Sequence, residues 1–381
     1  MKPRTLAILA LVTLFFAVAA VVVNSRGPAY TEASGGQLVF PDLDKKINDA
    51  ASITVEASGK SFTVKRTDKG WVVADKYDYP AKFDVVKQTL VGLAQLKTVE
   101  AKTADPSLYS RLQVEDPKEK DAKSALIAVA DAQGNSLAKL IVGKNDYNAS
   151  TNQGTLIYVR QPDDKQSWLA QGTLERNDDV KQWMDRELVQ LAPERVREVT
   201  VTPADGKPFL VHKDKPGSGD FTLDGVPSDD KVKSAYDVNA IGGALALLSL
   251  DDVLPAKDLK PDAKLLRTLD YKSFDGLVVD LALYQQDGKT WARIKASFDP
   301  AAAAAKPASP SGNAKAGTST AAAAADSSAA LKSVDAVKKD VAAITARTQD
   351  WAYGLEESDL ATLEKKFDDL IEPKTPSKPK S

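Results

Sequence analysis

The sequence predicts an α+β protein in which two similar domains, each an antiparallel sheet covered by helices, follow one N-terminal transmembrane helix. Three observations predict it. An apolar run stands near the N-terminus, one series of strand and helix signals occurs twice, and strands and helices are interleaved without the regular alternation of parallel α/β folds. A chain of 381 residues is long enough for about two domains.

The N-terminal apolar run is long enough to cross a bilayer as a helix. It extends from Leu6 to Val23, interrupted only by Thr13, and Lys2 and Arg4 precede it. At 1.5 Å per residue such a helix spans about 27 Å, close to the hydrocarbon thickness of about 30 Å. Positive charge before the run places the N-terminus in the cytoplasm. We therefore expect a single-pass protein of the inner (cytoplasmic) membrane, with the bulk of the chain periplasmic or extracytoplasmic.

A cleaved signal peptide is the alternative reading of this run. Ala17-Val18-Ala19 resembles the small-residue pattern at which such peptides are cut. The valines at 21–23 continue the apolar run beyond that point, which favours an uncleaved anchor. We assign 1–26 to the cytoplasmic stub and anchor, and 27–52, which is rich in Gly and Pro, to a tether.

The repeated series begins with a β-hairpin. Ile53–Val55 and Gly59–Phe62 are echoed by Val199–Val201 and Gly206–Phe209, and both stretches alternate apolar and polar residues around a glycine turn. A third strand, a helix with apolar residues three and four apart, and a Leu-x-x-Val segment follow in each copy. The third strands are Trp71–Val73 in the first copy and Phe221–Leu223 in the second. The helix of the first copy carries Phe83, Val86, Leu90 and Leu93. The helix of the second copy follows an N-cap at Ser228 and carries Val238, Ile241, Leu245 and Leu248.

The second halves of the copies match more loosely. In the first copy we expect strands near 124–131, 136–142 and 155–160, and a helix around Val180, Met184, Leu188 and Leu191. In the second copy we expect strands near 276–284, 290–297 and 351–353, and a helix at 331–346. The closing helix expected in the second copy is capped by Ser358 and carries Leu360, Leu363, Phe367 and Leu370. The predicted repeats are 53–192 and 193–372. The Ala/Ser/Pro-rich insertion 299–330 and the tail 373–381 are predicted to be disordered, because their composition cannot bury enough apolar surface.

Composition excludes several classes of function. The 51 basic and 53 acidic residues leave a formal charge of −2, which argues against nucleic-acid binding. The chain has no cysteine, so disulfides, thiolate catalysis, iron–sulfur clusters and cysteine-ligated zinc are excluded.

Phosphate and histidine chemistry find little support in the sequence. Gly59, Gly143 and Gly288 each precede a lysine, but none has the glycine five residues earlier that a P-loop requires, so we interpret all three as hairpin turns. His212 is the only histidine. No Gly-x-Ser-x-Gly elbow accompanies it, and we expect a solvent-facing strand residue.

Acidic pairs are the next candidates, because two carboxylates can act as acid and base on sugars. We expect Asp178-Asp179 and Asp229-Asp230 to stand at helix starts, where acids cap free amides and favour the helix dipole. Asp251-Asp252 is a third pair. Asp42-x-Asp44 lacks the glycine turn and distal glutamate of a calcium loop. We therefore assign no catalytic, cofactor-binding or metal-ligating residue, and no cofactor.

Tryptophans are placed in strands or helices rather than loops. Core packing is the simpler interpretation, and an aromatic platform for a glycan or a partner is the alternative. The residues are Trp71, Trp168, Trp183, Trp291 and Trp351.

Several short motifs resemble a bacterial envelope family, domain of unknown function 4340. They are Gly70–Val73, Tyr79–Ala81, Val99–Lys102, Tyr158–Arg160, Ser167–Ala170, Trp183–Arg186 and Trp351–Leu355. The resemblance covers most of 1–372 except the Ala-rich insertion. It implies no catalytic residue. It does imply genes nearby for an ABC-type ATPase, an ABC-type permease and a gliding-like auxiliary membrane protein.

We therefore expect a non-enzymatic, membrane-anchored auxiliary subunit of an ABC-type export or surface-assembly system, acting as a docking or substrate-guiding module. Its expected partners are the permease and the gliding-like auxiliary protein, which follow from the resemblance alone. The alternative is an envelope glycan- or peptidoglycan-binding module. A carboxylate-based hydrolase is a weaker third hypothesis.

Overall fold

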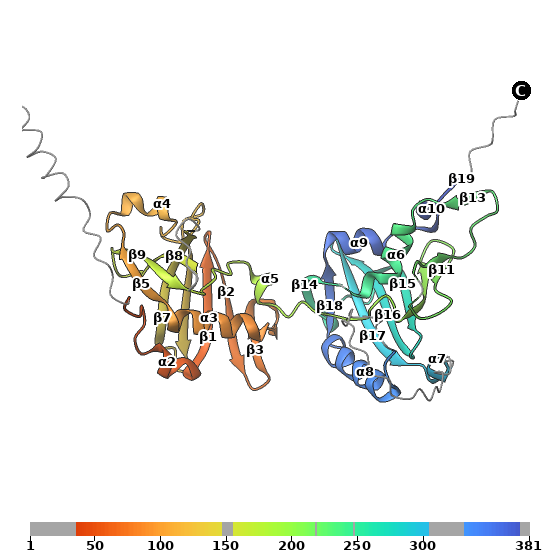
Figure 1. The fold of residues 1–381 in the computed structure, drawn as a ribbon, viewed down its shortest axis with the longest axis horizontal. Coiled ribbons are helices and arrows are strands. Elements are labelled where there is room, and N and C mark those ends of the chain that lie inside the picture. The colour runs from red at the N-terminus through yellow and green to blue at the C-terminus, as the bar shows by residue number, and fades with distance from the viewer. Residues whose placement is uncertain (1–35, 147–154, 218, 247, 305–330, 374–381) are drawn as a thin grey trace, which may run out of the picture. The chain divides into compact units, whose positions relative to one another are not determined.

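The computed structural model describes residues 36–146, 155–217, 219–246, 248–304 and 331–373 (Figure 1). The predicted anchor Leu6–Val23, most of the predicted insertion and the tail beyond 373 lie outside these ranges. Within them, no helix is long and apolar enough to cross a membrane. The described chain combines large antiparallel sheets with helices, and the predicted α+β class is correct at this level.

The first large sheet has nine strands in the order β4-β3-β2-β1-β6-β7-β8-β9-β5. From β1 to β9 each recorded neighbour pair runs antiparallel. The strands are β1 (Ala50–Ala57), β2 (Lys60–Thr67), β3 (Gly70–Val73), β4 (Tyr79–Pro80), β5 (Lys97–Ala101), β6 (Ala125–Asp131), β7 (Ser136–Asn145), β8 (Thr155–Arg160) and β9 (Ser167–Gly172).

The second large sheet has eight strands in the order β12-β11-β10-β15-β16-β17-β18-β14. A separate two-stranded sheet joins β13 to β19. The strands are β10 (Val196–Pro203), β11 (Phe209–His212), β12 (Thr222–Leu223), β13 (Asp230–Val232), β14 (Leu250–Pro255), β15 (Lys264–Ser273), β16 (Leu277–Gln286), β17 (Lys289–Phe298), β18 (Trp351–Leu355) and β19 (Ile371–Pro373).

Apart from β4, which has no counterpart in the second sheet, the two strand orders agree position by position. The hairpin strands β1, β2 and β3 occupy the places that β10, β11 and β12 occupy in the second sheet, and β6 to β9 correspond to β15 to β18. In both sheets the strand that follows the helix, β5 or β14, closes the far edge. The repeated order of hairpin, third strand, helix and strand that the sequence predicts is therefore present in the described chain.

Helices connect these strands. The described helices are α2 (Leu43–Lys46), α3 (Phe83–Gln95), α4 (Tyr109–Leu112), α5 (Val180–Trp183), α6 (Ala235–Gly243), α7 (Pro300–Ala304), α8 (Val334–Thr348), α9 (Glu357–Leu363) and α10 (Phe367–Leu370). The predicted helices at 83–93 and 331–346 correspond to α3 and α8. Phe83 departs from its expected place, because at the first position of α3 its side chain is 61% exposed.

The chain forms two compact units. The first contains residues up to Ser61 together with Val86–Asp178, and the second contains Phe62–Val85 together with the residues from Asp179 onward. Within the second unit, Ala81 bridges to Met184 in antiparallel fashion, and the Lys82 amide donates to the Trp183 carbonyl at 2.7 Å. These backbone contacts join the two stretches of sequence that make up the second unit.

The latter part of the predicted tether packs against the first sheet. Leu38 forms an antiparallel bridge with Lys97, and the Thr98 amide donates to the Gln37 carbonyl at 2.9 Å. Leu43 is 2% exposed. These residues therefore cover the outer edge of β5.

The predicted N-cap at Ser228 is wrong. The helix α6 begins after Ser234, whose hydroxyl accepts from the Asp237 amide at 3.4 Å. The intervening residues form β13, which pairs with β19 from the other end of the second repeat. A pairing partner so distant in sequence leaves no local signal, so the local N-cap signal at Ser228 was misleading.

Two further helix predictions need correction. The helix predicted from Val180 to Leu191 ends at Trp183, because Met184 turns to extended backbone and bridges to Ala81. The predicted closing helix is split into α9 and α10, and the N-cap of α9 is Glu356 rather than Ser358. In both places apolar residues at helical spacing are buried by tertiary packing without forming one continuous helix.

The start of the predicted disordered insertion is ordered. Residues 300–304 form α7, and Ala302 is 3% exposed. The Asp299 amide donates to the Gly276 carbonyl at 2.8 Å, and the Lys332 amide donates to Asp275 Oδ2 at 2.9 Å. Both flanks of the insertion are therefore attached to one turn, between β15 and β16.

Both faces of the first sheet bury apolar side chains. Ile127 and Leu140 pair across β6 and β7 on one face, and both are fully buried. Leu126 and Ile141 pair on the opposite face, which the 102–124 connection covers. The cluster on that face contains Tyr109, Val114, Ile141, Leu156, Tyr158 and Leu169, with Val99, Leu112 and Leu126 packed against it.

Gly143 is part of this covering contact. It lies inside β7 rather than in the hairpin turn that the sequence suggested. A Cβ at this position would lie 2.4 Å from the Leu112 carbonyl oxygen and 2.8 Å from that of Gln113. Only glycine allows the covering segment to approach the strand so closely.

The second sheet buries one face and leaves the other half-buried, with a charged residue among the apolar ones. In β16 the residues Leu277, Val279, Leu281 and Leu283 are buried and alternate with half-buried Val278, Asp280, Ala282 and Tyr284. Helix α6 lies on the buried face, where the Tyr271 hydroxyl donates to the Ile241 carbonyl at 3.0 Å. Helix α8 packs on β16, β17 and β18. Figure 1 shows α6 and α8 alongside this sheet.

Candidate functional site

A groove of about 980 Å³ opens in the second unit beside the connection between β10 and β11. This volume lies within the range of sites that bind small molecules or peptide side chains. Its walls come from the first hairpin of the second repeat and from the start of α10. The lining residues are Thr200, Pro203, Asp205–Leu210, Asp224, Gly225 and Lys366–Asp368.

The apolar part of the groove contains two aromatic rings. Phe209 of β11 and Phe367 of α10 have ring centroids 5.9 Å apart at an interplanar angle of 58°. Phe209 is 6% exposed, whereas Phe367 is half-buried. Exposed Pro208 adds apolar surface beside them, and buried Pro203 also lines the groove. A ligand here meets aromatic and proline surfaces.

A buried arginine holds α10 in position. Arg267 of β15 is 5% exposed, and its Nη1 donates to the carbonyls of Leu363 at 2.9 Å and Lys365 at 2.7 Å. These carbonyls end α9 and precede α10. Hydrogen bonds from a charged donor are stronger than those between neutral groups. Arg267 therefore attaches the α10 wall of the groove to the sheet.

The rim of the groove carries charge of both signs. Asp205, Asp224 and Asp368 supply three carboxylates, and Lys207 and Lys366 supply two ammonium groups. All five residues are exposed. The rim therefore has a small excess of negative charge.

His212 lies next to this rim. Its side chain is 26% exposed, its Nε2 is 3.4 Å from Asp214, and its Nδ1 is 3.2 Å from the groove residue Asp224. The Nδ1 contact is a close approach without hydrogen-bond geometry. His212 is thus a strand residue, as predicted, but it is half-buried between two carboxylates rather than solvent-facing.

A polar row on the open face of the sheet adjoins the groove. Thr200, which lines the groove, lies opposite Asp270; Asp270 lies opposite Asp280, and Asp280 lies opposite Lys295. Burial raises the pKa of Asp280, and the charge of Asp270 and a hydrogen bond with it raise that pKa further.

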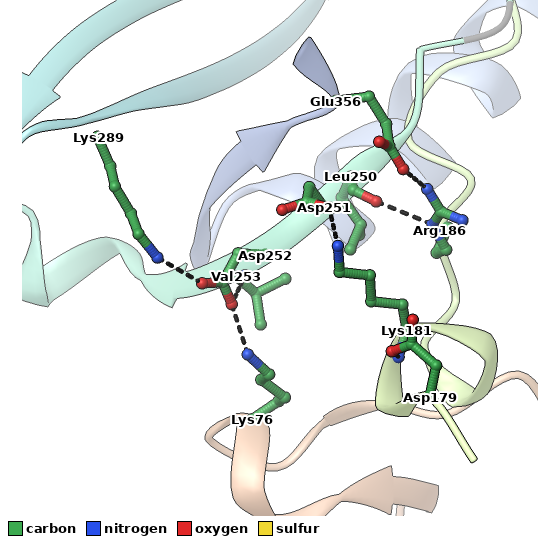
Figure 2. A network of polar contacts seen from close by, with 10 residues as sticks. All are labelled: Lys76, Asp179, Lys181, Arg186, Leu250, Asp251, Asp252, Val253, Lys289 and Glu356. Carbon is green, nitrogen blue, oxygen red and sulfur yellow. Dashed lines mark hydrogen bonds and ion pairs between the residues drawn. The ribbon is translucent and has the colours of Figure 1, made fainter. Parts of the chain in front are cut away.

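A second polar cluster lines β14, the edge strand of the sheet (Figure 2). Asp252 accepts from Lys76 at 2.8 Å and from Lys289 at 3.2 Å. Burial raises the pKa of Asp252, but hydrogen bonds and charges, above all those of Lys76, outweigh burial and hold it below its usual range. Figure 2 shows these two lysines reaching one carboxylate from different elements.

The same edge receives α5 and the segment that follows it. Lys181 pairs with Asp251, and Arg186 pairs with Glu356. Arg186 Nε also donates to the Leu250 carbonyl at 2.9 Å. Partly exposed ion pairs of this kind contribute modestly to stability. We interpret the cluster as a structural clamp over the edge of β14.

One protein-family model matches this chain. The family model for the domain of unknown function (DUF4340) matches residues 71–265, which is more than half of the sequence. The chain belongs to the DUF4340 family. The match includes the part of the groove on β10 and β11 and ends before α10. No curated protein and no solved structure matches the chain.

In this DUF4340 chain the glycine–lysine pairs have different settings. Gly59 and Gly288 have positive φ and lie in two-residue turns, between β1 and β2 and between β16 and β17. Gly143 lies in β7, so its predicted turn is wrong.

The acidic pairs also differ from one another. Asp179 caps α5 and accepts from the Lys181 amide, as predicted for a helix start. Asp230 begins β13, so the helix start predicted at Asp229-Asp230 is wrong. Asp251 and Asp252 belong to the β14 clamp. Asp42 pairs with its neighbour Lys45. Among the described residues, no group of three or more His, Cys, Asp or Glu side chains is placed to hold a metal ion.

The tryptophans lie in strands or helices, as predicted. Trp183 is fully buried and Trp291 is 7% exposed, so both belong to the core. Trp71, Trp168 and Trp351 are half-buried, and the Trp351 ring meets Tyr79 edge-on at 4.9 Å.

Sequence reasoning did not find the groove. Phe209 and Phe367 each matched an apolar position of a predicted element, and the residues between them number more than a hundred. The burial of Phe209 and the partial exposure of Phe367 depend on how α10 packs, and no sequence signal reports that packing.

Proposed function

We propose that this DUF4340 chain is a non-enzymatic docking subunit of an ABC-type export or surface-assembly system, anchored in the cytoplasmic membrane and acting on its outer side. The groove between Phe209 and Phe367 carries the proposal. Aromatic and proline surfaces with a rim of mixed charge suit a polypeptide segment, because protein interfaces combine an apolar centre with a polar edge. The expected partners are the permease and the gliding-like auxiliary protein implied by the family resemblance.

The repeats 53–192 and 193–372 form part of the proposal. Equal strand orders in the two sheets support a tandem duplication. In this view the first repeat became a closed structural domain, whereas the second kept an open face and a groove for docking.

Site-specific crosslinking in native membranes tests the docking role. A photoreactive amino acid at Lys207, on the groove rim, is expected to capture the permease. The same group at Lys339, exposed on α8, serves as the control and is expected to capture much less. Recovery of only unrelated soluble proteins from Lys207 would refute the docking proposal.

The proposed topology has its own test. A reporter that is active only outside the cytoplasm, fused after residue 372, is expected to be active. The mature chain is expected to begin at or near Met1. N-terminal sequencing that starts at Ala20 or Val21 would instead indicate a cleaved signal peptide and no anchor.

A glycan- or peptidoglycan-binding module is the second candidate. It rests on the partial exposure of Trp71, Trp168 and Trp351, since exposed aromatic rings dominate binding energetics. Binding to isolated cell-wall material that is lost in Trp168→Ala, with crosslinking to the permease absent, would favour this candidate.

A further inference from the structure

The sequence after the last described residue has the pattern of a polyproline II ligand. Pro373, Pro376 and Pro379 recur at every third residue. A polyproline II helix has three residues per turn, so this spacing aligns the prolines along one edge. Residues 374–381 also contain three lysines and no acidic residue; the lysines are Lys374, Lys378 and Lys380. The segment is therefore both proline-rich and basic.

The groove offers the surface that such a segment requires. Proline-rich polyproline II segments bind grooves lined by aromatic rings, because the preformed extended helix loses little entropy on binding. Here half-buried Phe367, whose ring centroid lies 5.9 Å from that of buried Phe209, and exposed Pro208 supply the accessible apolar surface. Half-buried Phe367 leaves part of its ring available for stacking.

The charge of residues 374–381 is complementary to the charge of the groove rim. The three carboxylates on the rim, Asp205, Asp224 and Asp368, outnumber its two lysines, whereas residues 374–381 carry positive charge alone. Opposite potentials of this kind favour one partner and one orientation over others.

The position of the segment in the chain favours binding within one molecule. Asp368 lies on the groove wall, and only β19 and the end of α10 separate it from the first residue of the segment. Eight residues of polyproline II extend about 25 Å. A short tether gives an effective concentration on the order of millimolar, so even weak affinity leads to high occupancy.

We propose that the groove binds basic polyproline II segments and that residues 374–381 of the same chain occupy it. The inference rests on the groove as the docking surface of the proposed function, and it names the class of ligand. A partner then has to displace the chain's own segment. Binding of residues 374–381 to the groove is measured on the purified protein, whereas capture of the permease is measured in membranes. Either result can therefore be negative while the other is positive, so failure of this inference and failure of the proposed function are distinguishable.

Disulfide trapping tests the intramolecular arrangement, because the natural chain has no cysteine. The double variant Lys207→Cys/Ser377→Cys of the full chain is oxidised in detergent. It is expected to form an intramolecular disulfide about tenfold faster than the control Lys339→Cys/Ser377→Cys, whose α8 site lies outside the groove lining. Equal rates would overturn the proposal. A covalent dimer would also overturn it, in favour of a second copy as the occupant.

Peptide binding tests the ligand class. A labelled peptide of residues 373–381 is expected to bind the chain lacking 374–381 about tenfold more tightly than the full chain, because the attached segment competes. Asp368→Asn is expected to weaken that binding, and Glu357→Gln, an exposed control on α9, is not. Equal affinity for both chains, or binding unaffected by Asp368→Asn, would refute the proposal.

Discussion

The two large sheets have the same strand order but differ in how their second faces are used. In the first sheet the 102–124 connection covers that face and contributes Tyr109 and Val114 to a buried cluster. In the second sheet the corresponding connection, 256–263, is short. Leu126 and Ile141 on the covered face correspond to Thr268 and Ala282 on the open face, which also carries the carboxylate pair Asp270 and Asp280. The length of one connection thus decides whether equivalent positions become core or surface.

The turns that follow β6 and β15 show a second difference. Asp131 stabilises the first turn from an exposed position by accepting from the amides of Gln133 and Asn135. Asp275 stabilises the second from a buried position and forms a bidentate ion pair with Arg195 at 2.8 and 3.1 Å. The second turn also receives the Lys332 amide, so it joins three distant segments.

Asp275→Ala should produce the largest loss in this comparison. It leaves the buried guanidinium of Arg195 without its principal partner, at an expected cost of about 3–5 kcal/mol in the free energy of unfolding. Asp131→Ala removes only exposed hydrogen bonds and should have a much smaller effect. Urea denaturation followed by circular dichroism measures both. Similar losses would show that the two turns are equally important to their sheets.

Ile141→Ala tests the covered face. Ile141 is 3% exposed, and emptying its site should cost about 2–5 kcal/mol. Val278→Ala, on the open face of the second sheet, is the matched control and should cost much less because its side chain is only half-buried. Equal costs in thermal or urea unfolding would mean that the open face is covered in solution.

Asp280→Asn should stabilise the protein slightly at pH 7. Like charges directly opposite on neighbouring strands are unfavourable by about 0.2–1 kcal/mol. The pKa of Asp280 is higher in the folded protein than in the unfolded chain. The unsubstituted protein therefore loses stability as the pH rises from the ordinary aspartate pKa through the raised pKa of Asp280. The gain from the variant should therefore appear above that window and disappear at lower pH. A gain that is independent of pH would contradict this account.

Shortening 305–330 to about half its length, towards the short 161–166 connection between β8 and β9, should have a similarly small effect. Loop-closure entropy changes by only about 0.6 kcal/mol per doubling of length. Asp299 and Lys332 already attach both flanks to the 273–277 turn. Limited proteolysis of the parent should cut in this segment first, and the two fragments should remain associated. Release of 331–381 as a free piece would refute the assignment of β18 and α9 to the second sheet's domain.

Local sequence patterns predict the α+β class, the repeated order of elements and most strand positions. Alternation in β16 and helical spacing in α3 are local patterns, and the turn at Gly288 depends on two adjacent residues with positive φ. Each of these signals lies within about ten residues. Strand β15 was not among the predicted strands, although its residues alternate in burial and it lies between β10 and β16 in the sheet.

Tertiary structure decided the rest. The pairing of β13 with β19 moved the start of α6 to Ser234, and the bridge from Ala81 to Met184 ended α5 early. The groove exists because Arg267 holds α10 beside Phe209. These contacts join residues about a hundred or more positions apart, and their free energy depends on packing geometry that no local periodicity encodes. The sequence therefore predicted the elements, and long-range packing determined the site.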